Sequence, residues 1–345
     1  MNTSPPAAPS PTCAAVAPLR RHAGLAAELL LLLVAAAWGS SYAVAKQVLL
    51  QVTVLHYLLL RFGLTALLLS PALVAVWTGR TQTQALRSLG VGLALGGILL
   101  VIFLCETCGV ARTTASNAAF LISLCVVFTP FVEWGLLGRK PAMVTLWAAV
   151  ACVVGTLLLA PQAITQPLES IGDWLMLAAA VLRALMVTAT RRLVQVHPVP
   201  ALTLTALQSW VVFVGLLVTT IVQHRGSAAL QLPNETTVWV AAAYLVVICT
   251  VFAFFAQNYA ASRLEPTTVG FLMASEPVFG ALSAQWLLSE QMTAVAWLGG
   301  ALIVVATSVT VKFGGVAARR PCVKPSTDTL ARRLHVEVRH DGFGL

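Results

Sequence analysis

The chain has 345 residues, of which 59% are hydrophobic and only 10% are charged, whereas a typical soluble domain is about half apolar and about a quarter charged. With a mean hydropathy of +0.88, it has too few charges to cover the polar surfaces of soluble domains of this total length. This composition excludes soluble enzymes, disordered regulators and disulfide-built secreted scaffolds, and it indicates an integral membrane protein.

The net charge of +9 reflects where the basic residues lie along the chain. Seven of them lie from Lys312 onward, and most of the others lie in short gaps between apolar runs. If the N-terminus is cytoplasmic, 16 basic residues fall in inside segments and 3 in outside segments. Lys and Arg are enriched in cytoplasmic loops, so the charge sets orientation and gives no reason to expect a nucleic-acid partner.

Ten apolar runs, each about long enough to cross a hydrocarbon core of about 30 Å, follow one another along the chain. They are continuous and do not alternate, which favours helices over barrel strands. Membrane helices are predicted at 26–46, 53–77, 88–110, 114–137, 142–160, 174–193, 200–222, 237–260, 267–288 and 293–313. An even number of crossings places both termini on the cytoplasmic side.

The flanking segments have a different composition. Residues 1–24 are rich in Pro, Ala and Ser and are expected to form a disordered tail. The predicted organisation is this tail, a first repeat over 25–160, a linker over 161–173, a second repeat over 174–314 and a basic cytoplasmic tail over 315–345.

A weak internal repeat appears at an offset of 151 residues. It places Arg112 on Arg263, and Phe120-Leu121 on Phe271-Leu272. The same offset places the fourth predicted helix on the ninth. Equivalent helices of the two copies are thus five helices apart. Because five is an odd number, the two copies cross the membrane in opposite directions. Inverted repeats are typical of secondary transporters.

Several short motifs in this order resemble the EamA-type transporters of the drug/metabolite transporter superfamily, over roughly residues 26–313. The motifs are Ala37-Trp38-Gly39-Ser40-Ser41-Tyr42, Leu60-Arg61-Phe62, Gly109 to Leu121, Ser275-Glu276-Pro277-Val278-Phe279 and Leu287-Leu288-Ser289-Glu290. The resemblance implies an all-α membrane fold of ten helices in two inverted five-helix repeats, with a central cavity for a small metabolite. Arg183 departs from the pattern, because an aromatic or small residue is expected there.

Two charges lie near the predicted membrane midplane, Arg183 in the sixth helix and Glu276 in the ninth. A charge at the bilayer centre costs at least about 2.5–3.5 kcal/mol, so each needs a partner or a wet cavity. We expect both to face the central cavity, where they pair directly or bind the charged ends of a substrate. The alternative is a structural pair. Pro277 follows Glu276 and is either a hinge or a packing kink.

Other residues within the membrane are expected to hold helices together. Arg61 either snorkels outward or meets Glu106 on the third helix, and a structural role is favoured. Gly92 and Gly96 form a small-xxx-small face, which predicts close helix packing.

Five uncharged side chains complete the predicted cavity. Trp38 and Tyr42 share one face of the first helix, where they either line a pocket or pack in the core. The neutral polar residues either orient a ligand or join helices; they are Asn117, Ser123 and Gln257.

These features predict a secondary transporter that moves a small organic metabolite, amino-acid-like or related, outward by alternating access. It is expected in the cell (plasma or inner) membrane, with the substrate and the lipid bilayer as partners. A homodimer is a possible assembly. The chain has no Walker A sequence and no H-E-x-x-H or G-x-S-x-G motif, so no nucleotide, cofactor, metal or catalytic residue is expected. The alternatives are a membrane enzyme acting on a small or lipidic substrate, and a receptor or channel.

Overall fold

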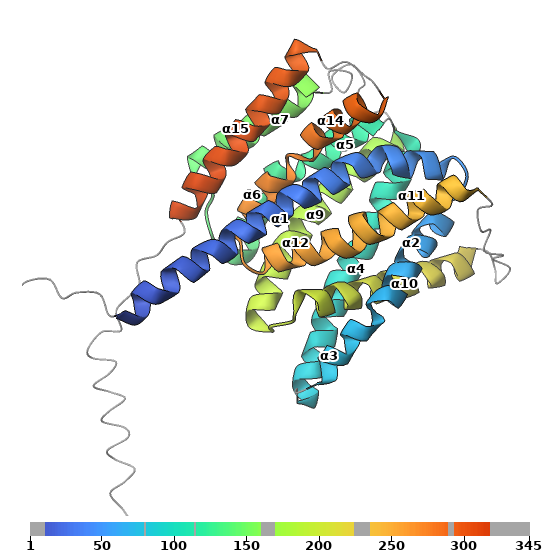
Figure 1. Cartoon of the computed structure of the whole chain (residues 1–345), viewed down its shortest axis with the longest axis horizontal. Helices are drawn as coiled ribbons and strands as arrows, with labels where there is room; N and C mark the ends of the chain where they lie inside the picture. The colour runs from blue at the N-terminus through green and yellow to red at the C-terminus, as the bar shows by residue number, and fades with distance from the viewer. Residues whose placement is uncertain are drawn as a thin grey trace, which may run out of the picture.

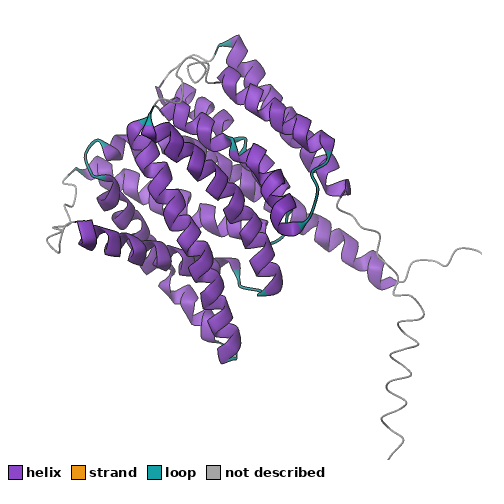
Figure 2. Ribbon diagram, turned by 180° about the vertical axis from the view of Figure 1, so that it is seen from behind, coloured by secondary structure: helices purple, strands orange, loops and turns teal. Residues whose placement is uncertain are grey.

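The computed structural model describes residues 11–78, 81–113, 115–159, 170–223, 235–288 and 293–317, and within these ranges it contains helices and no strand (Figures 1 and 2). The linker expected over 161–173 and the tail expected over 315–345 fall largely outside the described residues. The first helix begins at Pro11, so it includes residues that composition assigns to a disordered tail. The Ala, Leu and Arg residues of that stretch favour helix.

In the first half of the chain, the described residues form seven α-helices and one 3₁₀ turn. They are α1 (Pro11–Leu49), α2 (Val54–Leu69), η1 (Ser70–Leu73), α3 (Val74–Trp77), α4 (Gln82–Arg112), α5 (Ala115–Ser123), α6 (Cys125–Leu137) and α7 (Met143–Leu159).

The described residues of the second half are also helical, and they include one π-helical turn. Its elements are α9 (Ile171–Val196), α10 (Ala201–Gln223), α11 (Thr236–Val246), the π-turn η2 (Val247–Phe252), α12 (Ala253–Ala261), α13 (Pro266–Met273), α14 (Glu276–Leu288) and α15 (Ala294–Ala317).

Eight helical segments in the described ranges are long and apolar enough to cross a membrane. Met143–Leu159 is apolar but shorter, and the ninth predicted segment is divided into α13 and α14. Large apolar side chains are exposed on the outside of the bundle, for example Leu93 at 65% and Trp147 at 70%. Such a surface fits lipid and not water. The protein is therefore a multi-pass membrane protein, and the number of ten crossings stays a prediction.

Local sequence fixes where several helices begin and end. Capping boxes start α4, where Thr81 pairs with Gln84, and α9, where Ser170 pairs with Asp173. Each box satisfies backbone N–H groups that the first turn of a helix leaves unbonded. Gly138 ends α6 with a φ of +69°, a conformation that glycine adopts without steric cost.

The helices pack around α4 and α9, which lie against each other in the interior. The other face of α4 contacts α10, while α1 crosses α12 and α14. A separate pair, α7 and α15, runs along one side of the bundle (Figure 1). The prediction that Gly92 and Gly96 mark close packing is confirmed: a Cβ on either glycine would lie 2.6 Å from the Cβ of Leu207 or Val211 on α10.

Two membrane helices are broken at equivalent places of the repeat. The fourth predicted helix breaks at Leu124, between α5 and α6, and the ninth breaks at Ala274–Ser275, between α13 and α14. The offset of 151 residues places Leu124 on Ser275. At each break a serine hydroxyl donates to a carbonyl three residues earlier: Ser123 to Phe120 and Ser275 to Leu272, both at 2.6 Å. These local bonds compete with continued helix.

The break corrects the expected position of Glu276 and Pro277. Both were predicted in the middle of a continuous helix, but they occupy the first turn of α14. Proline is tolerated there because the backbone N–H groups of a first turn have no helical partner. A carboxylate is also stabilised by the partial positive charge of a helix N-terminus. Pro130 lies inside α6 and does not interrupt it.

Neighbouring glycines on α4 give a direct test of this packing. Gly96→Ala should lower stability by about 1–3 kcal/mol, the usual cost of overpacking, because its Cβ would clash with Val211. Gly97→Ala should not destabilise the protein, because nothing lies within 4 Å of a Cβ at that position. Thermal unfolding of both purified variants in the same detergent measures the difference, and equal melting temperatures would show that α4 and α10 are not in close contact.

Candidate functional site: a charged central cavity

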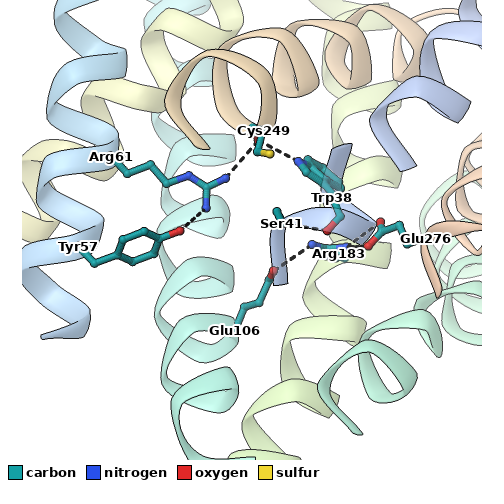
Figure 3. Close-up of polar contacts among 8 residues, drawn as sticks. All are labelled: Trp38, Ser41, Tyr57, Arg61, Glu106, Arg183, Cys249 and Glu276. Carbon is teal, nitrogen blue, oxygen red and sulfur yellow. Dashed lines mark hydrogen bonds and ion pairs between the residues drawn. The ribbon is translucent and has the colours of Figure 1, made fainter. Parts of the chain in front are cut away.

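Three charged side chains meet in the interior (Figure 3). On α9, Arg183 donates through Nη1 to both carboxylate oxygens of Glu276, at 3.1 and 3.2 Å. Through Nη2 it donates to both oxygens of Glu106 on α4, at 3.2 and 3.1 Å. One guanidinium therefore joins α4, α9 and α14, and we call these three residues the charged triad.

The charged triad is well removed from solvent. The exposed side-chain fractions are 14% for Arg183, 13% for Glu106 and 4% for Glu276. Two carboxylates and one guanidinium give the triad a net charge of −1. Desolvated charges of this kind are tolerated only when they are paired and hydrogen-bonded, so removal of the cation would leave two buried acids facing each other.

Trp38 on α1 covers the arginine of the triad. The Arg183 guanidinium lies 4.8 Å from the centre of the indole ring, within the range of a cation–π contact. The indole nitrogen donates to the carbonyl of Cys249 at 2.9 Å. A Cβ on the next residue, Gly39, would lie 2.5 Å from the carbonyl oxygen of Glu276. The absence of a side chain at Gly39 thus brings α1 against α14 and Trp38 over the triad.

The π-turn η2 supplies the acceptor that this arrangement uses. Within it the N–H of Ala253 bonds to the carbonyl of Ile248, five residues earlier, in place of the carbonyl of Cys249. The Cys249 carbonyl instead accepts from Trp38 and from Arg61. Isolated π-turns are frequent at functional sites. Nothing in the sequence Val247 to Phe252 signals this turn, which is why sequence reasoning missed it.

Arg61 takes neither of its two predicted positions. It is 7% exposed, so it does not snorkel, and Glu106 pairs with Arg183 instead. Its donors reach Tyr57 Oη at 3.0 Å and the η2 groups Thr250 Oγ1 at 2.6 Å and Cys249 O at 3.1 Å.

A small cavity lies between these groups. It is lined by Trp38, Ser41, Arg61, Leu99, Ile102, Phe103, Glu106, Arg183, Met186, Phe254 and Gln257. The volume open to the centre of a water molecule is about 30 Å³, which holds about two waters. The cavity has polar and aromatic walls suited to a small ligand, but in this conformation it is small.

The structure separates the predicted cavity residues into two groups. Trp38, Arg183 and Gln257 line the cavity, and Glu276 reaches it through its bonds to Arg183. The backbone of Tyr42 lies on α1, but its side chain is outside the described part of the structure.

The other two predicted residues lie elsewhere in this conformation. Asn117 donates to Asp173, and Ser123 bonds at the break between α5 and α6. Sequence reasoning did not place Arg61, Ser41 or Phe254 at the cavity. For Arg61 a signal was present, because it is a charged residue inside a predicted membrane helix.

Polar contacts join helices at the end of the bundle where α4 stops and α9 begins. The Asp173 carboxylate accepts from Thr113 Oγ1 at 2.6 Å and from Asn117 Nδ2 at 2.5 Å. It also accepts from the N–H of Ser170 at 3.2 Å. We call these four residues the Asp173 cluster, and it ties α9 to the start of α5.

A second cluster joins helices at the opposite end, where α6 and α9 stop and α13 begins. The Glu133 carboxylate accepts from the N–H of Thr267 at 3.0 Å and from its hydroxyl at 2.5 Å. Arg139 pairs with Glu265 and lies 3.8 Å from Glu133, and Arg191 lies 3.7 Å from Glu265. We call these five residues the Glu133 cluster.

Within the described ranges no group of three or more His, Cys, Asp or Glu side chains is placed to hold a metal ion. Cys105 and Cys108 lie partly buried on α4. The chemistry available at the cavity is therefore that of charge, hydrogen bonds and aromatic faces. Buried charges beside a cavity between membrane helices are typical of membrane proteins that provide a pathway for ions or small molecules.

Comparison with known proteins identifies the family. The EamA-like transporter family matches residues 25–160 and again 170–312. A protein of Archaeoglobus fulgidus named as an uncharacterised transporter is 26% identical over 290 residues, covering 82% of this chain and 96% of its own length. A solved crystal structure shares the fold with a TM-score of 0.64 at 16% identity, covering 85% of this chain and 99% of its own. The chain belongs to the EamA-like transporter family and is a membrane transporter of the drug/metabolite transporter type.

The charged triad makes a strong prediction for stability. Arg183→Gln should destabilise the protein by about 3–5 kcal/mol, because Glu106 and Glu276 then face each other without a cation. The measurement is thermal unfolding of the purified protein in detergent.

A neutral version of the same network is the matched control. Combining Arg183→Gln with Glu106→Gln and Glu276→Gln removes all three charges and should recover most of the lost melting temperature. A single variant as stable as the wild type would show that the triad does not hold these helices together.

Proposed function

We propose that this transporter is a secondary carrier that moves a small organic metabolite, amino-acid-like or related, outward through the central cavity. The observation that carries the proposal is the charged triad beside the cavity. It joins α4 of the first predicted repeat to α9 and α14 of the second. A substrate that disturbs one carboxylate contact would therefore change how the two repeats are held together.

Alternating access would use the two polar clusters as gates. With the basic loops in the cytoplasm, the Glu133 cluster is the inner gate and the Asp173 cluster the outer one. The contacts within both clusters are formed in this conformation, and the cavity is small, which is what an occluded state would require. In each half of the cycle one cluster would open while the other stays closed.

The two helix breaks would serve as the moving joints. Leu124 and Ser275 occupy equivalent positions of the predicted inverted repeat, and each separates a half-helix next to a gate from the rest of its helix. Pro277 lies in the first turn after the second break, and its missing N–H removes one hydrogen bond that a continuous helix would form there. This supports the hinge role proposed for it.

The topology proposed for this cycle has ten crossings, two inverted repeats and both termini in the cytoplasm, in the plasma or inner membrane. A membrane enzyme is the second candidate, but no specific feature of the cavity favours it. The two differ in the fate of the compound, because a carrier relocates it unchanged while an enzyme alters it.

The proposal predicts export from proteoliposomes loaded with a uniformly ¹³C-labelled cell extract. Mass spectrometry of the medium should detect one or a few labelled compounds that leave chemically unchanged and that empty liposomes retain. Arg183→Ala and Glu276→Ala should reduce that export at least about tenfold, because the triad adjoins the substrate.

Arg87→Gln is the matched control, since Arg87 is an exposed cation on α4, away from the cavity, and it should export at the wild-type rate. Reconstituted amounts are equalised by quantitative blotting. Wild-type liposomes that retain every compound, or that release only altered ones, would contradict the proposal. Full export by both triad variants would remove the triad from the mechanism.

A further inference from the structure

Arg61 carries a buried charge that no acid of the described structure neutralises by direct contact. The ion pairs of the described residues involve other cations, and the hydrogen-bond partners of Arg61 are two hydroxyls and one carbonyl. Phe103 adds a weaker contact, its ring centre lying 5.1 Å from the guanidinium carbon. A buried cation held only by neutral groups retains a strong attraction for an anion.

The guanidinium also has donors to spare. Arginine has five N–H bonds, and the three contacts of Arg61 use one on Nε and one on each terminal nitrogen. One N–H therefore remains on Nη1 and one on Nη2, and two N–H groups on different guanidinium nitrogens can bind the two oxygens of a carboxylate. The side chain extends from α2 toward Trp38, Ser41 and Glu106 (Figure 3), and it forms part of the cavity wall.

The other charged groups at the cavity have the opposite sign in total. Glu106 and Arg183 also line the cavity, and Glu276 bonds to Arg183. The charged triad carries a net −1 and Arg61 carries +1, so the cavity region is neutral in total but strongly dipolar. Its positive end lies on α2 and its negative end on α4, α9 and α14.

We propose that Arg61 binds the carboxylate of the transported compound, and that the compound is a zwitterion whose ammonium group lies toward Glu106. This inference rests on the proposed function. Arg183 was the expected cation for a substrate, but two carboxylates already neutralise it. Arg61 takes that role because its charge is not matched.

The dipole also sets what the cavity rejects. A dianion would place its second negative charge against the triad, and a simple cation would lie beside Arg61, so both are disfavoured. The ammonium group of the zwitterion competes with Arg183 for Glu106. Substrate binding is thereby linked to the contact that joins the two repeats.

The test compares three forms of one compound. The amino acid that wild-type proteoliposomes export fastest from the labelled extract is compared with its primary amide, which lacks the carboxylate, and its N-acetyl derivative, which lacks the ammonium. Each form is measured as a competitor of export of the labelled amino acid. Both derivatives should compete at least about tenfold more weakly, because each loses a charge-assisted contact.

Arg61→Gln assigns the carboxylate contact to this residue. It should raise the half-saturating concentration of the amino acid about tenfold or more. The concentration of amide that halves export should change less than about twofold. Arg61→Lys keeps the positive charge but loses the paired N–H groups of the guanidinium. Its half-saturating concentration for the amino acid should lie between those of the wild type and Arg61→Gln. Arg87→Gln, which removes an exposed cation of the same helix bundle, should match the wild type.

Each outcome decides between the alternatives. Exported compounds without both charged groups, equal competition by the amide, or an Arg61→Gln effect that is the same for acid and amide would each overturn the inference while leaving the carrier function intact. Wild-type liposomes that export nothing would instead overturn the proposed function itself. If Arg61→Gln is not recovered as folded protein, the comparison of acid and amide in the wild type still tests whether the cavity requires a carboxylate.

Discussion

The arrangement of this transporter depends on one buried arginine held between two glutamates. A guanidinium in the middle of a membrane bundle is stable only where carboxylates meet it, and Arg183 meets Glu106 and Glu276 with all four of their oxygens. The helices that carry the three residues cannot move apart without exposing a charge to a medium that does not solvate it. The triad therefore fixes the relative positions of α4, α9 and α14, and the cavity forms against it.

The rest of the site follows from this contact. Trp38 lies over Arg183 because Gly39 allows α1 to approach α14 closely. The π-turn η2 frees a carbonyl that holds both Trp38 and Arg61. Arg61 is the cavity cation that no acid of the described residues contacts directly. Its positive charge and the net negative charge of the triad make the cavity region dipolar, although its total charge is zero. We propose that this small cavity represents one state of a cycle in which substrate charge replaces a protein contact.

Much of the fold can be predicted from the sequence, because lipid imposes long apolar helices that are visible as apolar runs. The Arg183–Glu276 pair can also be anticipated, since an intramembrane charge requires a partner. The missing parts depend on contacts between helices. Glu106 was expected to meet Arg61 only as one of two alternatives, because spacing along one helix does not show which neighbour a side chain reaches. The break before Glu276 and the π-turn at Cys249 were missed because they come from local bonding, by Ser275 and Ala253, that leaves no mark in hydropathy.

We propose above all that the substrate passes through the cavity beside the triad. Ser41 lies in the wall of this cavity and is not part of the triad, so it is a suitable position for a test. In a cysteine-free background, Ser41→Cys can be reacted with a small thiol-specific methanethiosulfonate reagent, in the presence and absence of the exported compound. We expect modification of this cysteine to block export, and we expect the exported compound to slow the modification. Full export after complete modification, with no protection by the compound, would contradict it.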